Sequence, residues 1–155
     1  MKIMLPIDGS PDALAAVHHA LALVRAGLQA DFVLVNVQEP AKLYEIVTAH
    51  DAEVIDHVRA DAGADLLRPA EALLQEAGVA WESEVVGGEA ESQLVDAVER
   101  YGCDAVMIGL HGTGTREGVL AGPVCSAVLR HSPVPVTVVR APDAEAVYQE
   151  AANEG

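Results

Sequence analysis

The feature that most constrains the fold is the alternation of short, mostly apolar runs with longer segments in which apolar residues recur every three or four positions. The apolar runs fall at 2–8, 31–37, 81–86, 104–110 and 133–140. Runs of this length predict strands, and the segments between them have the period of helices. Strands that alternate with helices are typical of βαβ units. We therefore predict an α/β fold, a single domain with five parallel strands and helices on both faces of the sheet.

The predicted helices carry start signals and one interruption. The first begins at Ser10, Pro11 and Asp12, an N-cap hydroxyl followed by a proline and an acid in the first turn. A long helix is predicted from about 51 to 77, and Pro69 within it predicts a kink or a break. Its expected buried stripe is Val54, Ile55, Val58, Ala62, Leu66, Leu67, Leu73 and Leu74. Two more helices are predicted, from about 89 to 102 and from about 122; Val124, Val128 and Leu129 are expected on the buried face of the second.

The last apolar run has the features of an edge strand. Pro135 removes a donor from the ladder of interstrand hydrogen bonds, so we expect this strand at an edge of the sheet. Val134, Val136 and Val138 alternate with Pro135 and Thr137 along it. Because an uncovered edge can pair with another chain, this strand is a candidate interface.

Composition excludes several classes of partner. The chain of 155 residues, 51% hydrophobic, suits one domain. With 24 acidic and 9 basic residues its formal charge is −15, which argues against nucleic acid or an anionic membrane surface as partner. No run approaches the roughly 18 apolar residues of a membrane span, and the first ten residues do not resemble a signal peptide. We therefore expect a cytoplasmic protein, with Cys103 and Cys125 as free thiols.

The strand exits contain the candidate ligand site. In an open parallel sheet, ligands bind beyond the carboxyl ends of the strands, where the strand order reverses. After the fourth apolar run come Gly109, Gly112 and Gly122, and a helix is predicted to begin directly after the last of these. Glycines allow close approach of the backbone, and the N–H groups at a helix N-terminus attract phosphate. The pattern indicates a phosphate-binding loop, although an unliganded turn would use the same glycines.

The opening KIMLPIDGSPDA, the span DAVMIGLHG and the ending GPVCSAVLRHSPVPVTVVR together resemble the universal stress protein family along nearly the whole chain. In that family the pattern G-x2-G-x9-G-[ST] marks the members that bind ATP. The resemblance implies strand order 3-2-1-4-5 in an adenine nucleotide alpha hydrolase-like fold. It also implies a universal stress protein domain over 1–140. The residues after it, 141–155, include four acids and no Lys or Arg and are predicted to form an acidic tail. A homodimer through the last strand, from Val134 to Val139, and an unidentified protein partner are expected as well.

The resemblance also implies a set of nucleotide contacts. Those to the adenosine part fall on Pro6, Ile7, Asp8, Val37 and Ile108. Those to the phosphates fall on Gly109, Gly112, Gly122, Pro123, Val124 and Cys125, and Arg116 in the same loop could supply positive charge.

Two of these positions depart from the family pattern. Where ATP-binding relatives resemble G-S-V-S or G-S-V-T, Pro123 removes a hydroxyl and an N–H, and Cys125 replaces an oxygen with a weak S–H donor. Losing two or three hydrogen bonds to a charged partner costs about 3 to 6 kcal/mol. We therefore expect ATP to bind at roughly 100 μM or more weakly, and AMP or another adenosine ligand to lose less.

Catalytic and redox roles have weaker support in the sequence. Asp8, Ser10 and His111 follow strands that the family places side by side, but Ser10 is better explained as an N-cap. Cys125, at a predicted helix N-terminus, is a candidate reactive thiol.

The function predicted first is a cytoplasmic, dimeric regulatory module of the stress response, with a weakened phosphate grip, no dedicated catalytic centre and no intrinsic metal. One alternative is a genuine ATP-binding protein, with or without slow hydrolysis, in which Arg116, His111 and a divalent cation replace the missing hydroxyls. The other alternative is a nucleotide-free dimer that works through its acidic surface and its sheet edge. The sequence leaves these alternatives open.

Overall fold

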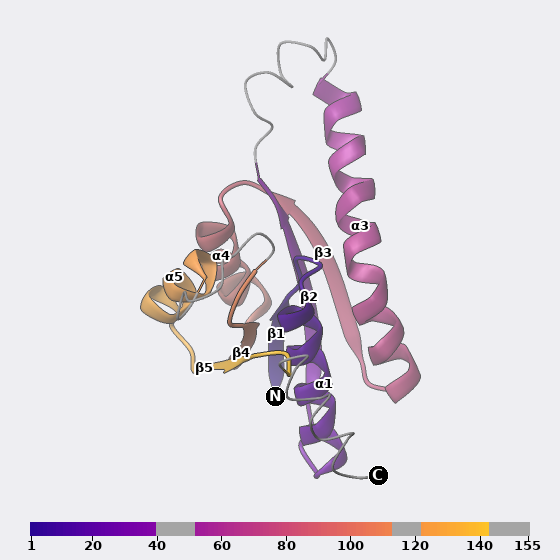
Figure 1. The fold of residues 1–155 in the computed structure, drawn as a ribbon, viewed down its shortest axis with the longest axis vertical. Coiled ribbons are helices and arrows are strands. Elements are labelled where there is room, and N and C mark those ends of the chain that lie inside the picture. Colours follow the sequence, from indigo (N-terminus) through magenta and orange to yellow (C-terminus); the bar gives the residue numbers. More distant parts are fainter. Residues whose placement is uncertain (40–51, 113–121, 143–155) are drawn as a thin grey trace.

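The computed structural model describes residues 1–39, 52–112 and 122–142, without the side chains of 52–55. Within these ranges five parallel strands form one sheet in the order β3-β2-β1-β4-β5 (Figure 1). The strands are β1 (Lys2–Pro6), β2 (Asp31–Gln38), β3 (Trp81–Gly87), β4 (Ala105–Gly109) and β5 (Val136–Val139). The predicted α/β class and strand order are confirmed.

Helices cover both faces of this sheet. They are α1 (Pro11–Arg25), α3 (Ala52–Ala77), α4 (Ala90–Tyr101) and α5 (Pro123–His131). Helices α1 and α3 pack on one face, and α4 and α5 pack on the other (Figure 1). Successive strand residues point to opposite faces, so Ile3 and Leu5 join the core beneath α1 and α3, whereas Met4 joins the core beneath α4 and α5. Burial on both faces explains why the strand sequences are almost continuously apolar.

Helix α1 follows the predicted start signals. The Ser10 Oγ accepts a hydrogen bond from the Ala13 N–H at 3.2 Å, and Pro11 and Asp12 occupy the first two helical positions. The helix ends at Arg25. This start places Ser10 and Asp12 beside the exits of β1 and β4, where the candidate site lies.

Helix α3 differs from the prediction in two ways. Of the kink or break predicted at Pro69, the break was wrong, because the helix continues through this residue. Pro69 lies on the exposed side, where water can satisfy the carbonyl that loses its helical partner, while Leu67 and Ala70 hold the opposite side against the sheet. The expected buried stripe was also wrong in part, since 62% of Val58 and 36% of Leu66 are exposed.

The buried positions of α3 include a glycine that the apolar pattern did not mark. A Cβ on Gly63 would lie 2.5 Å from Cγ1 of Val85 and 2.8 Å from Oδ1 of Asn36. The absence of a side chain therefore lets the helix approach β2 and β3 closely at this point. In Figure 1 the first turns of α3 extend past the end of β2.

Strand β5 lies at the edge of the sheet, as Pro135 predicted. It is shorter than the predicted 133–140 because the two prolines in that run cannot donate to the ladder, although the Pro135 carbonyl still accepts from the Val106 N–H at 2.9 Å. On the neighbouring helix α5, Leu129 is 48% exposed, which contradicts its predicted burial. None of the helices in the described ranges is long and apolar enough to cross a membrane.

Candidate functional site

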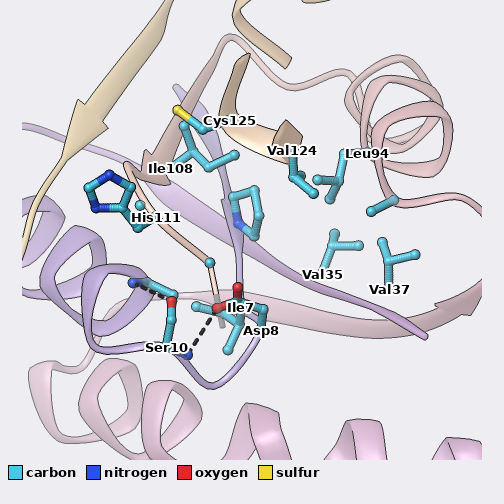
Figure 2. Close-up of a pocket in the computed structure, with 15 residues that line it drawn as sticks. Ile7, Asp8, Ser10, Val35, Val37, Leu94, Ile108, His111, Val124 and Cys125 are labelled. Carbon is cyan, nitrogen blue, oxygen red and sulfur yellow. Dashed lines mark hydrogen bonds between the residues drawn. The ribbon is translucent and has the colours of Figure 1, made fainter. Parts of the chain in front are cut away.

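A pocket opens at the carboxyl edge of the sheet, beside the exits of β1 and β4 (Figure 2). The strand order reverses between these two strands, which is where parallel sheets form ligand sites. The pocket encloses about 80 Å³ and shares Asp8, Val37, Ala90, Gly112 and Val124 with a wider hollow of about 390 Å³. The wider hollow is within the usual range of roughly 300 to 1,000 Å³ for small-molecule sites.

Apolar side chains from the sheet and α4 form most of the pocket wall. Ile7 and Ile108 are 2% and 4% exposed, and Val35, Val37 and Leu94 complete this side (Figure 2). Such walls favour a ligand that buries uncharged surface, because apolar contact is favourable in proportion to the area removed from water.

The exit of β1 is held by a chain of hydrogen bonds. The Ile7 N–H donates to the Val35 carbonyl at 2.9 Å, and the Asn36 Nδ2 donates to the Ile7 carbonyl at 2.7 Å. The Oδ1 of Asn36 in turn accepts from the Gln38 Nε2 at 2.8 Å. Sequence reasoning missed Asn36, although an amide inside the apolar run DFVLVNV was a usable signal, since buried polar groups need partners.

Asp8 directs its carboxylate into the turn that follows β1. Its Oδ1 accepts the Ser10 N–H at 2.9 Å, and its Oδ2 would lie 2.7 Å from a Cβ on Gly112. The two strand exits therefore approach each other too closely for a side chain at position 112.

Gly109 ends β4 against the start of α1. A Cβ at this position would lie 2.8 Å from the Ala13 nitrogen and 2.9 Å from the Asp12 Cβ. Close packing within the protein thus explains Gly109 and Gly112 without a ligand.

The N-terminus of α5 forms the remaining side of the pocket. The Gly122 N–H donates to the Leu110 carbonyl at 2.8 Å, and Pro123 has no N–H. In the first turn, the N–H groups of Val124 and Cys125 have no acceptor within the helix, and Gly122 supplies no side-chain cap. Two backbone donors therefore remain for an anion at this helix end.

The structure opposes the hypothesis that Cys125 is a reactive thiolate. The residue is 2% exposed, and burial raises the pKa of its thiol above the ordinary value. Burial also raises the pKa of the Cys103 thiol, and both cysteines are free. At neutral pH the Cys125 side chain is a neutral, weak donor.

Asp12, which was predicted only as a first-turn acid, contacts two loops. Its Oδ2 accepts the backbone N–H of His111 at 2.9 Å, and its Oδ1 accepts the backbone N–H of Ala141 at 2.7 Å. The His111 ring also lies beside it, with Nδ1 at 3.6 Å from Oδ2. Ser10, the third residue of the candidate catalytic set, directs its hydroxyl to the Ala13 N–H, which supports its interpretation as an N-cap.

The structure brings most of the predicted nucleotide contacts together. Those that line the pocket are Pro6, Ile7, Asp8, Val37, Ile108, Gly109, Gly112, Val124 and Cys125. Pro123 lines the wider hollow, Gly122 is buried at the start of α5, and Arg116 lies outside the described residues. Their roles in binding a ligand stay predictions. Across the described ranges, no cluster of three or more His, Cys, Asp or Glu side chains could hold a metal ion.

Comparison with known proteins places this fold and pocket in a family. The model of the universal stress protein family matches residues 1–140. A universal stress protein of Methanocaldococcus jannaschii is 26% identical over 144 residues, which cover 93% of this chain and 84% of the relative. A universal stress protein of Synechocystis is 31% identical over 138 residues, which cover 88% of this chain and 83% of the relative.

Solved structures show the same fold. A universal stress protein family protein from Arabidopsis thaliana with AMP bound matches with a TM-score of 0.69 at 19% identity, covering 94% of both chains. A universal stress protein in complex with cAMP matches with a TM-score of 0.66 at 24% identity, covering 92% of this chain and 98% of the other. By the extent of the family match and the curated relatives, this chain belongs to the universal stress protein family.

Proposed function

We propose that this chain is a regulatory module that binds an adenine nucleotide at the carboxyl edge of its sheet and holds the nucleoside part more firmly than the phosphates. The pocket carries this proposal, because its β1, β2 and β4 side is apolar and its α5 side presents few donors. AMP and cAMP are the ligands of two proteins with the same fold, and both have a single phosphorus.

The charges near α5 support a weak phosphate grip. The wider hollow beside Pro123 is bordered by the carboxylates of Asp8 and Glu39. No Lys or Arg among the described residues lines either that hollow or the pocket. Each added phosphate would bring negative charge toward these carboxylates, and within the described part of the chain two backbone N–H groups of α5 are placed to offset it.

Calorimetric titration with AMP, ADP and ATP tests this proposal. We expect AMP to bind at least as tightly as ATP, and ATP to bind at roughly 100 μM or more weakly. Restoring hydroxyls with Pro123→Ser and Cys125→Ser together should strengthen ATP binding by about tenfold or more, because each hydrogen bond to a charged partner contributes about 1.5 to 3 kcal/mol. Cys103→Ser makes the same chemical change in the core away from the pocket and serves as the control.

Two outcomes would contradict the proposal. Micromolar ATP binding by the unmodified chain would favour the second candidate, a true ATP-binding protein, for which the place of His111 on the pocket lining is the supporting observation. Titrations with no heat and no saturation for any nucleotide would favour the nucleotide-free interaction module.

The place of β5 supports a further proposal, that two copies pair through this strand. It is an edge strand, and Thr137 on it is exposed. Light scattering at micromolar concentration should give the mass of a dimer. Thr137→Glu should shift the mass toward a monomer because like charges would meet across the symmetric pair. Ser92→Glu, at an exposed position of α4, should not. A monomer mass for the unmodified chain would contradict this proposal.

A further inference from the structure

Asp12 has a buried carboxylate whose two oxygens accept backbone N–H groups from two different loops. The residue is 8% exposed. Its Oδ2 accepts from His111 at 2.9 Å, and its Oδ1 accepts from Ala141 at 2.7 Å. A carboxylate near a helix N-terminus is stabilised by the helix dipole, but that stabilisation needs neither burial nor these contacts.

The first of these loops belongs to the pocket. His111 lines the pocket at the end of β4 (Figure 2). Gly112, which follows it, packs against Asp8. The Asp12 backbone also packs closely against this turn, since a Cβ on Gly109 would lie 2.8 Å from the Asp12 carbonyl carbon. The turn from Gly109 to Gly112 is therefore held by Asp12, through the His111 N–H and close packing at Gly109, and by Asp8, through close packing at Gly112.

The second loop follows the edge strand. The pairing of β4 with β5 ends where the Leu110 N–H donates to the Val139 carbonyl at 2.8 Å. Beyond that bond, His111 and Ala141 are each bonded to the Asp12 carboxylate. The carboxylate thus connects the two strand exits one step after their direct hydrogen bonding ends, and α1 contacts both β4 and β5.

We propose that Asp12 is a positioning residue that couples the pocket to the segment after β5. A ligand that contacts the turn from Gly109 to Gly112 further restrains the His111 N–H, which restrains the carboxylate and through it Ala141. Coupling of this kind is reciprocal, so ordering of the β5 exit strengthens ligand binding to the same degree. The proposal rests on the proposed function for its ligand, AMP, but the contacts themselves exist without one.

Amide hydrogen exchange of the full chain, measured by NMR with and without AMP, tests the coupling. In the unmodified chain AMP should slow exchange at both His111 and Ala141 by about tenfold or more, in line with the strength of hydrogen bonds to charged groups. Asp12→Asn keeps one acceptor oxygen and turns an NH₂ group toward the other N–H. In that variant AMP should still protect the amides of Val124 and Cys125 but no longer protect Ala141.

The matched control is Glu91→Gln. Glu91 occupies the second position of α4, as Asp12 does in α1, but it lines a surface hollow beside His131 and not the pocket. The control removes a first-turn carboxylate with its helix-dipole contribution, so Ala141 should respond to AMP as in the unmodified chain. A merely structural role of Asp12 would change exchange throughout the domain and leave the response of Ala141 to AMP intact.

Every outcome of the exchange experiment either supports or overturns the coupling. The proposal is overturned if Ala141 responds to AMP equally with and without Asp12, or if AMP binds the unmodified chain and Ala141 does not respond. If no nucleotide binds, the proposed function fails, and the ligand-free protein tests the coupling instead. There, Ala141→Pro removes the donor on the β5 side, and exchange at the His111 N–H should rise about fivefold or more; an unchanged rate would overturn the coupling.

Discussion

The N-termini of α1 and α5 lie at the same edge of the sheet, yet the protein treats them differently. At α1 the Ser10 hydroxyl caps the helix, and Asp8 accepts the Ser10 N–H. At α5 the N-cap is Gly122, which has no side chain to accept a hydrogen bond, and the first turn contains no acidic residue. The protein's own acceptors bind the Ser10 and Ala13 N–H groups at the start of α1, whereas the start of α5 leaves the Val124 and Cys125 N–H groups for a ligand.

This difference shows how one edge of a sheet can combine a start of a helix that is held by contacts within the chain with another that keeps donors for a ligand. The α1 end fixes the walls of the pocket through contacts within the chain. The α5 end keeps free N–H donors, although the Gly122 N–H is bonded to the Leu110 carbonyl and Pro123 has no N–H. We infer that the site binds its ligand mainly through shape and apolar contact. Hydrogen bonds from α5 to an anionic group of the ligand make a smaller contribution.

The largest expected effect comes from breaking the contact between β4 and α1. Gly109→Ala places a methyl group 2.8 Å from the Ala13 nitrogen, and backbone atoms cannot move aside cheaply. We expect the free energy of unfolding to fall by about 3 kcal/mol, measured by urea denaturation. Gly87→Ala, where the nearest atom is 3.9 Å away, is the control and should cost less than about 1 kcal/mol. Equal losses in the two variants would show that the close contact is unimportant.

The pH dependence of stability tests whether burial or the positive end of the α5 dipole has the larger effect on the pKa of Cys125. Burial raises the pKa of both buried thiols, so each stays neutral in the folded state at a pH where the unfolded chain ionises. The unfolded state is then favoured as pH rises above roughly 8.5, the ordinary thiol pKa. The free energy of unfolding should fall there by at most about 1.4 kcal/mol per pH unit for each thiol.

Cys125→Ala should remove part of that fall, in denaturation curves measured between pH 7 and 10. If the helix N-terminus outweighed burial, the Cys125 pKa would instead be lowered, and stability would rise as pH increased through that range. Rapid alkylation of Cys125 in the native protein at pH 7 would be a second sign of the same contradiction.

Removing the cap of α1 should make its start resemble that of α5. Ser10→Ala leaves the Ala13 N–H without its acceptor and should lower the free energy of unfolding by about 1 kcal/mol, detectable by urea denaturation. Ser92→Ala, at an exposed position in the first turn of α4, should change stability by no more than about 0.5 kcal/mol. A neutral result at position 10 would mean that Asp8 and the pocket walls hold the turn without the cap.

The smallest effect on stability should come from giving α5 the cap that α1 has. Gly122 already has N-cap backbone angles, φ −64° and ψ 161°. A Gly122→Ser hydroxyl would accept an N–H in the first turn, with a stability change of only a few tenths of a kcal/mol. Because that N–H is then no longer available to a ligand, AMP affinity measured by calorimetry should fall severalfold. Unchanged affinity would indicate that α5 donors do not contact the ligand.

The sequence predicted what depends on neighbouring residues and missed what depends on distant ones. Strand runs, the start of α1 and the edge position of β5 each follow from a few adjacent residues. The contacts of Asp12 join residues separated by 99 and 129 positions, and Asn36 reaches across 29. No local pattern specifies such partners.

The misassigned stripe of α3 has a related cause. Apolar periodicity marked Val58 and Leu66 as buried, but the helix meets the sheet through Gly63, Leu67, Ala70 and Leu74. A glycine contributes nothing to an apolar pattern, although it sets the closest approach to Val85 and Asn36. For the same reason the glycines of the candidate site could be noticed, but their packing role could not be separated from a ligand-binding role.

The hydrogen bond from Gly122 to the Leu110 carbonyl has a consequence for how new ligand preferences could be built into this scaffold. It joins the exit of β4 to the start of α5 and so closes the chain between them at a defined pair of residues. Doubling the length of such a closed loop costs only about 0.6 kcal/mol of chain entropy. We therefore expect insertions between positions 112 and 122 to leave the bond between Gly122 and Leu110 in place, which urea denaturation of such variants would check.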